Sequence, residues 1–285
     1  MQLISQIKKD MDFNLNLYNL IEILKQIAFA QYHMLEKKIH VFDDFMGIIG
    51  EIFSMIDINM EKSLHPLLNI GKRQPAVIAV TSDSGLLGGL NMQVMNLAIK
   101  HVTEKSAKLY IVGEKGKTYA EESGITYTSF EGVKDEIRFA QALALRDFII
   151  NEELSRKIGL LILIYAHPIS IISQKVHSIQ LLPFSKSSYP QIAQSDAQAP
   201  ASLILESSAE EIIEYLVYLL LGHKFNEIFG LSRLAELSAR FVHLEDSKNT
   251  IEQLNKQLKL QYFRQRHELM DRNMRELFAA RLAFK

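Results

Sequence analysis

Glycine and proline, the two residues that most strongly break helices, are missing from both ends of this sequence. The first glycine is Gly47, the first proline is Pro66, and neither residue occurs after Gly230. Without break signals, the two ends would form helices about 70 and 80 Å long. A compact domain of 285 residues is too small to bury helices of that length. The sequence therefore predicts two long terminal helices that lie partly outside a globular domain.

The N-terminal segment carries a stripe whose members are alternately three and four residues apart, the pattern of a coiled coil. All members are apolar except Asn14 and Lys25. The stripe consists of Ile4, Ile7, Met11, Asn14, Tyr18, Ile21, Lys25, Ala28, Tyr32, Leu35, Ile39, Phe42, Met46, Ile49, Phe53 and Ile56. A single amphipathic helix on a core could show the same stripe, but its length favours a coiled coil.

A weaker stripe with the same spacing runs through the C-terminal segment. Its apolar members are Leu237, Phe241, Leu244, Ile251 and Leu258, and it is interrupted by Lys248, Asn255, Gln265 and Arg272. Beyond Tyr262 the segment becomes basic. We expect this end to leave its partner helix and to enter another surface, with a frayed, solvated end as the alternative.

The middle of the chain alternates between strand-like and helix-like segments, which predicts a mostly parallel sheet with helices on its faces. We expect strands at 75–81, 108–112, 125–130, 158–166 and 175–182, and helices at 90–101, 114–123 and 134–153. Residues 185–202 indicate a surface loop, and Ser208 with Glu211 indicates a capping box. The predicted domains are an N-terminal coiled-coil helix (1–58), a Rossmann-like α/β domain (59–206) and a C-terminal coiled-coil helix (207–285), with the two helices antiparallel.

Composition excludes several classes of function. The absence of cysteine excludes disulfides, zinc–thiolate sites and cysteine nucleophiles. The net charge of -1 gives no basic excess for nucleic acid. The apolar runs 159–166 and 216–221 are too short to span a membrane, and the N-terminus does not resemble a signal peptide. We expect a soluble protein of a reducing compartment, or one that reaches a membrane only through partners.

The sequence offers no recognisable active site. The nine histidines lack metal-binding spacing, and no nucleophile stands at a recognisable distance from a base. The adjacent acidic pairs at 43–44 and 121–122 would point to different faces of a helix. We therefore expect no catalytic residue, no metal and no cofactor.

The sharpest local motif is SDSGLLGGLN at residues 82–91, between a predicted strand and a predicted helix. Its structural residues are Ser82, Asp83, Gly85, Gly88 and Gly89. Such a loop could cradle a phosphate at a helix N-terminus. However, it lacks the Lys-Ser/Thr ending of a P-loop and the glycine spacing of a dinucleotide fold. The local residues favour a tight turn that brings the helix close to the strand.

This motif resembles a stretch of the gamma subunit of F-type ATP synthases, which typically reads Ser-Asp-Arg-Gly-Leu-Cys-Gly-Gly-Leu-Asn. Here Ser84 replaces the arginine and Leu87 replaces the cysteine. The C-terminal similarity runs without a gap over 239–284, and includes Ala239-Arg240-Phe241, Leu254, Leu258, Leu260, Tyr262 and Arg264-Gln265-Arg266. A weaker similarity lies around Ile7, Met11, Leu24, Ile27 and Ala28. The resemblance covers nearly the whole chain.

The chain departs from the family pattern near its C-terminus. His267 replaces the usual Gln, Met270-Asp271 the usual Ile-Thr, Asn273 the usual Glu, and Ala280-Arg281 the usual Gly-Ala. These positions lie where the family contacts its catalytic ring. They indicate a divergent member, or a member that belongs to an alternate ATPase.

The resemblance implies the central stalk, or rotor shaft, of a complex that couples ion translocation to ATP synthesis or hydrolysis. Its implied partners are the alpha and beta subunits of the catalytic hexamer, the epsilon subunit and the membrane c-ring. The implied location is the cytoplasmic face of the bacterial inner membrane, without membrane insertion. Arg264, Arg266 and Arg275 would meet acidic loops of the ring, and Leu277, Leu282 and Phe284 would lie in an apolar bearing. The alternatives are a phosphate- or nucleotide-binding protein that uses the glycine-rich loop, and a coiled-coil scaffold outside any motor.

Overall fold

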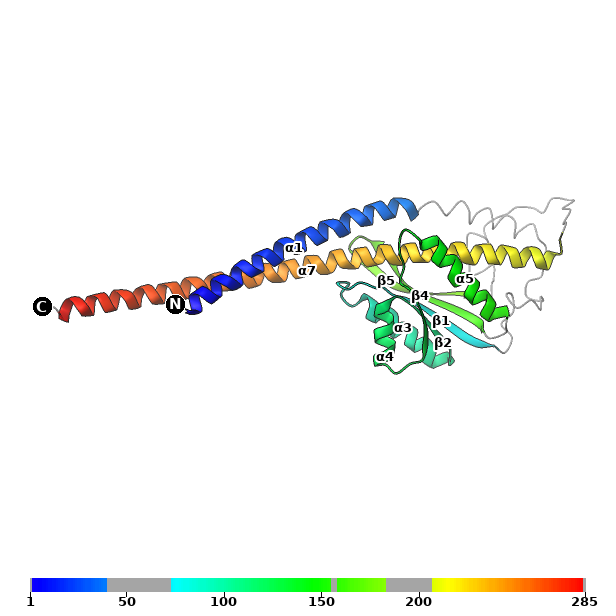
Figure 1. Cartoon of the computed structure of the whole chain (residues 1–285), viewed down its shortest axis with the longest axis horizontal. Helices are drawn as coiled ribbons and strands as arrows, with labels where there is room; N and C mark the ends of the chain where they lie inside the picture. Colours follow the sequence, from blue (N-terminus) through cyan, green and yellow to red (C-terminus); the bar gives the residue numbers. More distant parts are fainter. Residues whose placement is uncertain (1, 40–72, 155–157, 183–206, 284–285) are drawn as a thin grey trace. The chain divides into compact units, whose positions relative to one another are not determined.

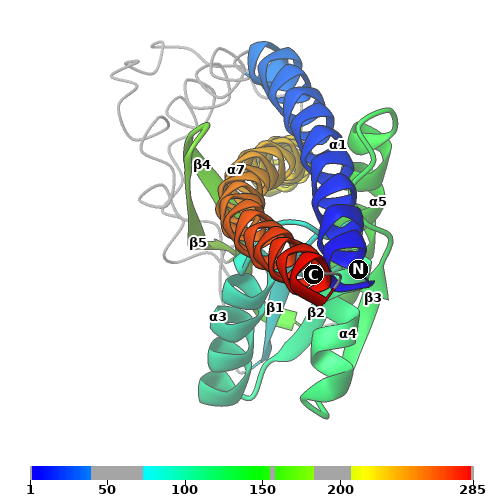
Figure 2. The same ribbon diagram turned by 90° about the vertical axis from the view of Figure 1, so that its left-hand side faces the viewer.

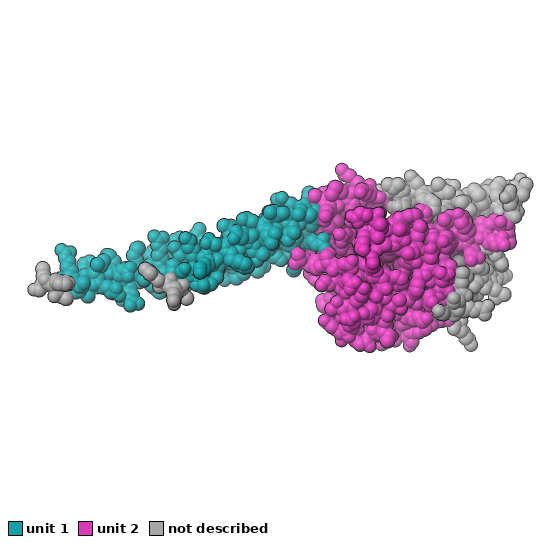
Figure 3. All heavy atoms as spheres, in the orientation of Figure 1, with its two compact units in different colours: residues 1–29, 240–285 teal, residues 30–239 magenta. Residues whose placement is uncertain are grey.

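The computed structural model describes residues 2–39, 73–154, 158–182 and 207–283. The chain divides into two compact units, shown in Figure 3. Unit 1 comprises Met1–Phe29 and Arg240–Lys285, and unit 2 comprises Ala30–Ala239. Two long helices, α1 (Gln2–Ile39) and α7 (Ala209–Ala283), contribute residues to both units.

Unit 2 is built on a five-stranded sheet in the order β3-β2-β1-β4-β5 (Figure 1). The strands are β1 (Gln74–Val80), β2 (Lys108–Val112), β3 (Tyr127–Phe130), β4 (Ile158–Ser170) and β5 (Ser173–Leu182). The helices between them are α3 (Leu90–Lys105), α4 (Glu114–Glu122) and α5 (Arg138–Leu154). All neighbouring strands are parallel except β5, which pairs antiparallel with β4. This arrangement confirms the predicted Rossmann-like α/β fold.

Both faces of the sheet are covered, which explains why β1 is almost continuously apolar. Ile78 and Val80 of β1 belong to the core cluster that includes α5 and the first part of α7. Val77 and Ala79 point the other way, into the cluster that contains Val94 and neighbouring residues of α3. The alternation follows from the two-residue period of a strand.

The helix α7 passes through two glycines without a break, and arginine side chains of α5 fill the space beside them. A Cβ at Gly222 would lie 3.0 Å from Nη1 of Arg146, and one at Gly230 would lie 2.9 Å from Nη1 of Arg138. Arg138 also donates from Nε to Oδ1 of the buried Asn226, at 3.1 Å. These contacts join α5 to α7 within unit 2.

In unit 1, α1 and α7 form the predicted antiparallel coiled coil, and Figure 2 shows the two helices next to each other. Ile21 of α1 packs with Leu244 and Ile251 of α7. Every member of the N-terminal stripe from Ile4 to Ile39 is buried or half-buried, which confirms the stripe over the part of α1 that the structure describes. We call the line of contact between the helices in unit 1 the seam. The stripe members beyond residue 39 and the loop 185–202 lie outside the described residues.

The predicted elements need small corrections at their ends. The predicted strand 158–166 continues to Ser170, because Pro168 is accommodated opposite Gln174 next to a register shift near the hairpin end. The predicted helix 134–153 begins at Arg138 instead, since the side chain of Gln141 holds residues 132 and 134 in a loop. At the start of α7, Ser208 accepts a hydrogen bond from the backbone N–H of Glu211 at 3.3 Å, as the capping box predicts.

None of the described helices combines the length and the apolar character that a membrane span requires.

Candidate functional site

Four charged residues cross the seam of unit 1, and we call them the charge cluster. Lys25 on α1 lies 2.7 Å from the Glu245 carboxylate on α7, and Lys248 on α7 lies 2.7 Å from the Glu22 carboxylate on α1. Glu22 also lies 3.1 Å from Lys25 on its own helix. The two lysines that interrupt the apolar stripes are therefore paired with carboxylates of the opposite helix.

The ion pairs of the charge cluster shift the pKa values of Glu22 and Lys248. Hydrogen bonds from Lys248 and then Lys25 lower the pKa of Glu22 from 4.5 to about 2. The hydrogen bond to Glu22 is the largest influence that raises the pKa of Lys248 above its ordinary value. The ammonium of Lys248 also lies 5.3 Å from the ring centre of Tyr18, which adds a cation–π contact. Glu22 and Lys248 therefore stay charged through the physiological pH range.

On the face of α1 that points away from α7 lies a second apolar line, which we call the outer stripe. Phe13, Leu20, Ile23 and Ile27 follow the spacing of seven, three and four, and their exposed fractions are 67%, 52%, 55% and 47%. Asn16 interrupts the line between Phe13 and Leu20. A soluble helix seldom leaves several apolar side chains of one face uncovered. The outer stripe is therefore a candidate contact surface for a partner.

The C-terminal part of α7 extends past the start of α1 (Figure 1). Because the two helices are antiparallel, residues that face each other have a constant sum of residue numbers. This sum is 270 for both ion pairs between the helices, Lys25 with Glu245 and Glu22 with Lys248. Gln2 therefore lies level with roughly residue 268 of α7. All residues from Asp271 to Leu282 are exposed. As the sequence predicted, α7 leaves its partner helix, and it remains helical to Ala283.

The predicted ring-contact residues lie along this end of α7. Arg264, Arg266 and Arg275 are exposed, and the exposed fractions of Leu277 and Leu282 are 68% and 75%. Phe284 lies outside the described residues. Met270, Met274 and Phe278, which the sequence reasoning did not single out, are also more than half exposed. Their spacing of four and four along one helix was the signal that could have identified them.

The glycine-rich loop follows β1 and is closed mainly by its own hydrogen bonds. The Asn91 side chain accepts from the backbone N–H of Ser82 at 3.2 Å and donates to the Ser82 hydroxyl at 2.8 Å. Gly88 has a φ of 58°, in the left-handed region that favours glycine. A Cβ at Gly85 would meet no atom within 4 Å, and one at Gly89 would make only ordinary contact with Met92. Of the three glycines, Gly88 alone is required by its backbone conformation.

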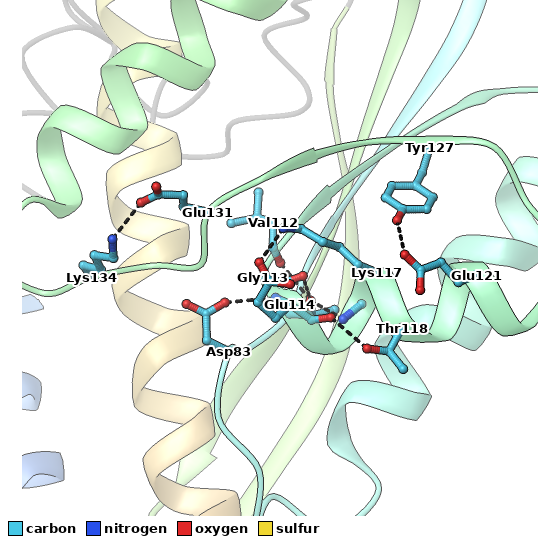
Figure 4. Close-up of polar contacts among 12 residues, drawn as sticks. Asp83, Val112, Gly113, Glu114, Lys117, Thr118, Glu121, Tyr127, Glu131 and Lys134 are labelled. Atoms are coloured by element: carbon cyan, nitrogen blue, oxygen red, sulfur yellow. Dashed lines mark hydrogen bonds and ion pairs between the residues drawn. The ribbon is translucent and has the colours of Figure 1, made fainter.

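Asp83 fixes this loop to the start of α4 (Figure 4). Its carboxylate accepts a hydrogen bond from the backbone N–H of Glu114 at 2.9 Å, where the helix dipole favours a negative group. A polar cleft of about 280 Å³ beside the loop is lined by Asp83, Ser84, Val133, Lys134, Asp135, Glu136, Arg233 and Glu236. The four carboxylates in this lining disfavour a phosphate, since Arg233 is already paired with Glu236 at 2.7 Å. Among residues 2–39, 73–154, 158–182 and 207–283, no group of three or more acidic or histidine side chains could hold a metal ion.

A family model described as ATP synthase matches residues 4–283. The chain is 25% identical to the ATP synthase gamma chain of Chlorobaculum parvum over 273 residues, which cover 92% of each protein. It is 28% identical to the ATP synthase gamma chain of Symbiobacterium thermophilum over 220 residues, covering 75% of this chain and 74% of the relative.

Solved structures with the same fold include a chain of the rotor of the Euglena gracilis mitochondrial ATP synthase. The TM-score is 0.65 at 15% identity, and the match covers 94% of this chain and 99% of the other. A chain from the central stalk and c-ring of the Tetrahymena thermophila enzyme gives a TM-score of 0.59 at 18% identity, covering 80% of this chain and 99% of the other. Because the family model accounts for nearly all of its residues, the chain belongs to the ATP synthase family, and the relatives named here are gamma chains.

Proposed function

We propose that this chain is the central-stalk subunit, the rotor shaft, of an F-type ATP synthase or ATPase. Two observations on the molecule support the role besides its family. Unit 1 is a two-helix shaft, and its surface carries the outer stripe and an unpaired, exposed end of α7. An exposed apolar shaft of this kind is suited to enclosure by other subunits. The outer stripe is the observation that carries the proposal.

The proposed partners are the alpha and beta subunits of the catalytic hexamer around the shaft, with the epsilon subunit and the membrane c-ring on the other side. The chain would then be a peripheral subunit at the cytoplasmic face of the bacterial inner membrane. Nucleotide chemistry would take place in the hexamer, and this chain would supply no catalytic residue.

The shaft would act through differences in contact energy. A two-helix shaft with one longer helix has no threefold symmetry, so each rotational angle presents different side chains to each catalytic subunit. A contact can shift a subunit between open and closed states only by as much as it favours one of them. In this mechanism Arg264, Arg266 and Arg275 meet acidic loops, and Leu277, Leu282 and Phe284 form the apolar bearing.

Replacing Arg264, Arg266 and Arg275 together by alanine in the assembled complex tests the role. We expect lower ATP-driven ion pumping per ATP hydrolysed, because the charged contacts of the shaft with the ring are lost. A matched control replaces two exposed lysines of α3, Lys100 and Lys105, by alanine. Unchanged pumping in the triple variant would refute the assigned contacts. Failure of the unmodified chain to assemble with alpha and beta subunits would refute the rotor role itself.

A further inference from the structure

Unit 2 contains a pocket with apolar walls, formed by residues of β2, β3, α5 and α7 and of the loop before α5, and we call it the α5 pocket. Its volume is about 210 Å³. Three of its lining residues, Val112, Leu145 and Phe229, are almost fully buried. The others are Phe130, Glu131, Ile137, Gln141 and Ala144. Among these described residues, Glu131 is the one that carries a charge.

Two residues of α5 leave the space of the α5 pocket unfilled. The amide of Gln141 is used by the loop before α5, where it accepts from the backbone N–H of Lys134 and donates to the carbonyl of Gly132, both at 2.9 Å. The side chain of Ala144, one turn further along, is a single methyl group. Ile137, which also lines the pocket, is 46% exposed, so the apolar surface continues to the outside. An apolar hollow that opens to the surface is a typical contact site.

The volume of the α5 pocket indicates what kind of occupant fits. Pockets that hold drug-sized ligands measure about 300–1,000 Å³. The α5 pocket is smaller and suits one aromatic or branched apolar side chain. A single large side chain that fills a pocket is the usual centre of a contact between proteins. The size therefore favours a segment of a partner polypeptide.

The loop 131–137 gives the surroundings of the α5 pocket a negative charge. Glu131 lines the pocket, its side chain is 74% exposed, and it is paired with Lys134 at 2.7 Å (Figure 4). The same loop also lines the polar cleft beside Asp83, where four carboxylates outnumber the two cations, Lys134 and Arg233. A complementary partner would carry basic side chains next to its apolar anchor.

We propose that unit 2 binds a basic segment of a partner polypeptide, with one large apolar side chain in the α5 pocket and neighbouring lysines or arginines facing the loop 131–137. The apolar side chain supplies the burial, and the acidic surroundings select the charge of the segment. This inference concerns unit 2 alone and does not depend on the proposed function.

Fluorescence of short peptides tests the proposal, because the chain itself contains no tryptophan. Three capped tripeptides, Lys-Trp-Lys, Gln-Trp-Gln and Glu-Trp-Glu, are titrated with the full-length chain. We expect a saturable blue shift of the tryptophan emission for Lys-Trp-Lys. At low salt its dissociation constant should be at least about tenfold lower than that of Glu-Trp-Glu. High salt should reduce this difference, because it screens exposed charges.

Variants of the chain show whether the peptide occupies the α5 pocket. Ala144→Phe fills the pocket from an exposed position of α5 and should weaken binding of Lys-Trp-Lys at least about tenfold. The matched control, Ala30→Phe, adds the same side chain at an exposed position of α1 that does not line the pocket, and should bind like the parent. Glu131→Gln should weaken binding of Lys-Trp-Lys about two- to fivefold and leave that of Gln-Trp-Gln unchanged.

Three results would overturn the proposal: no saturable binding of Lys-Trp-Lys, equal binding by the parent and Ala144→Phe, or equal affinities for Lys-Trp-Lys and Glu-Trp-Glu. Circular dichroism checks the helical content of each variant. If Ala144→Phe loses helical content, Glu131→Gln decides. A weakening confined to Lys-Trp-Lys then supports the proposal, and an unchanged affinity overturns it.

Discussion

The hydroxyl of Thr81, just after β1, accepts a hydrogen bond from the backbone N–H of Gly116 in the first turn of α4, at 3.1 Å. The same hydroxyl donates to the carbonyl of Val112 at the end of β2, at 2.8 Å. A Cβ on Gly116 would lie 2.5 Å from this hydroxyl and 2.6 Å from Cγ2 of Ile111. The glycine thus allows α4 to lie directly against the ends of two strands.

Gly116→Ala should therefore destabilise unit 2 by about 1–3 kcal/mol, the usual cost of overpacking a core. Urea unfolding followed by circular dichroism measures the change. Gly85→Ala is the control, because its Cβ would meet no atom within 4 Å. Equal unfolding midpoints for both variants would contradict the tight contact.

Arg146 of α5 is a second packing centre in unit 2. Its guanidinium carbon lies 3.5 Å from the ring centre of Tyr218, and only 6% of the residue is exposed. Arg146→Met should cost about 2 kcal/mol, because a desolvated cation–π contact and charge-assisted hydrogen bonds are lost. Tyr218→Phe keeps the ring and should cost about 1 kcal/mol. The same unfolding assay applies, and a smaller effect for the arginine variant than for the phenylalanine variant would contradict the stacking.

The stability of unit 1 should fall in acid because of Glu22. Its pKa is lowered from 4.5 to about 2 by the two lysines, so the folded form binds a proton less readily than the unfolded form. The stabilising contribution is complete above pH 4.5 and is lost as the pH falls towards 2. Thermal melts at several pH values should show this loss in the parent chain and a weaker one in Glu22→Gln. Glu252→Gln, which alters an exposed ion pair within α7, should retain the parent's acid response.

His167 should make unit 2 sensitive to milder acid. Burial, followed by the charge of His177, lowers the pKa of His167 below 6.5, and its ring lies 5.0 Å from that of His177. Glu227 opposes this shift, and Lys224 strengthens it. A histidine whose pKa is lower in the folded chain than in the unfolded chain stabilises the fold at pH values above its unfolded-state pKa. This stabilisation is lost as the pH falls through its folded-state pKa.

His167→Gln should accordingly reduce the loss of stability when the pH is lowered from about 6.5 to about 5. Chemical unfolding at both pH values provides the measurement. His267→Gln, on the exposed end of α7, serves as the control. An equal loss in the parent and in the His167 variant would show that this side chain does not contribute to the acid response.

The sequence indicated much of this fold because its elements are strongly patterned. The stripe that contains Ile21 and Ala28 predicted their burial, and the apolar segment 75–81 predicted β1 within one residue at each end. Periodicity is a local property, so it is visible without knowledge of the partner surface.

Contacts between residues far apart in the sequence were harder to predict from the sequence. Lys248 interrupted the apolar pattern, and nothing near it in sequence pointed to Glu22, which lies 226 positions away across the seam. Asp83 was recognised as part of a loop motif, but its bond to Glu114 depends on where α4 begins in space. The outer stripe was readable from its spacing and was overlooked because the neighbouring stripe accounted for α1.

The two glycines of α7 affect how easily this long helix can bend. Residues without side chains are the positions at which a long helix would bend most readily under load. At Gly222 and Gly230 the guanidinium groups of Arg146 and Arg138 occupy the space into which the helix would flex. Bending towards α5 at either position must first displace an arginine side chain, so the two arginines oppose bending of the helix.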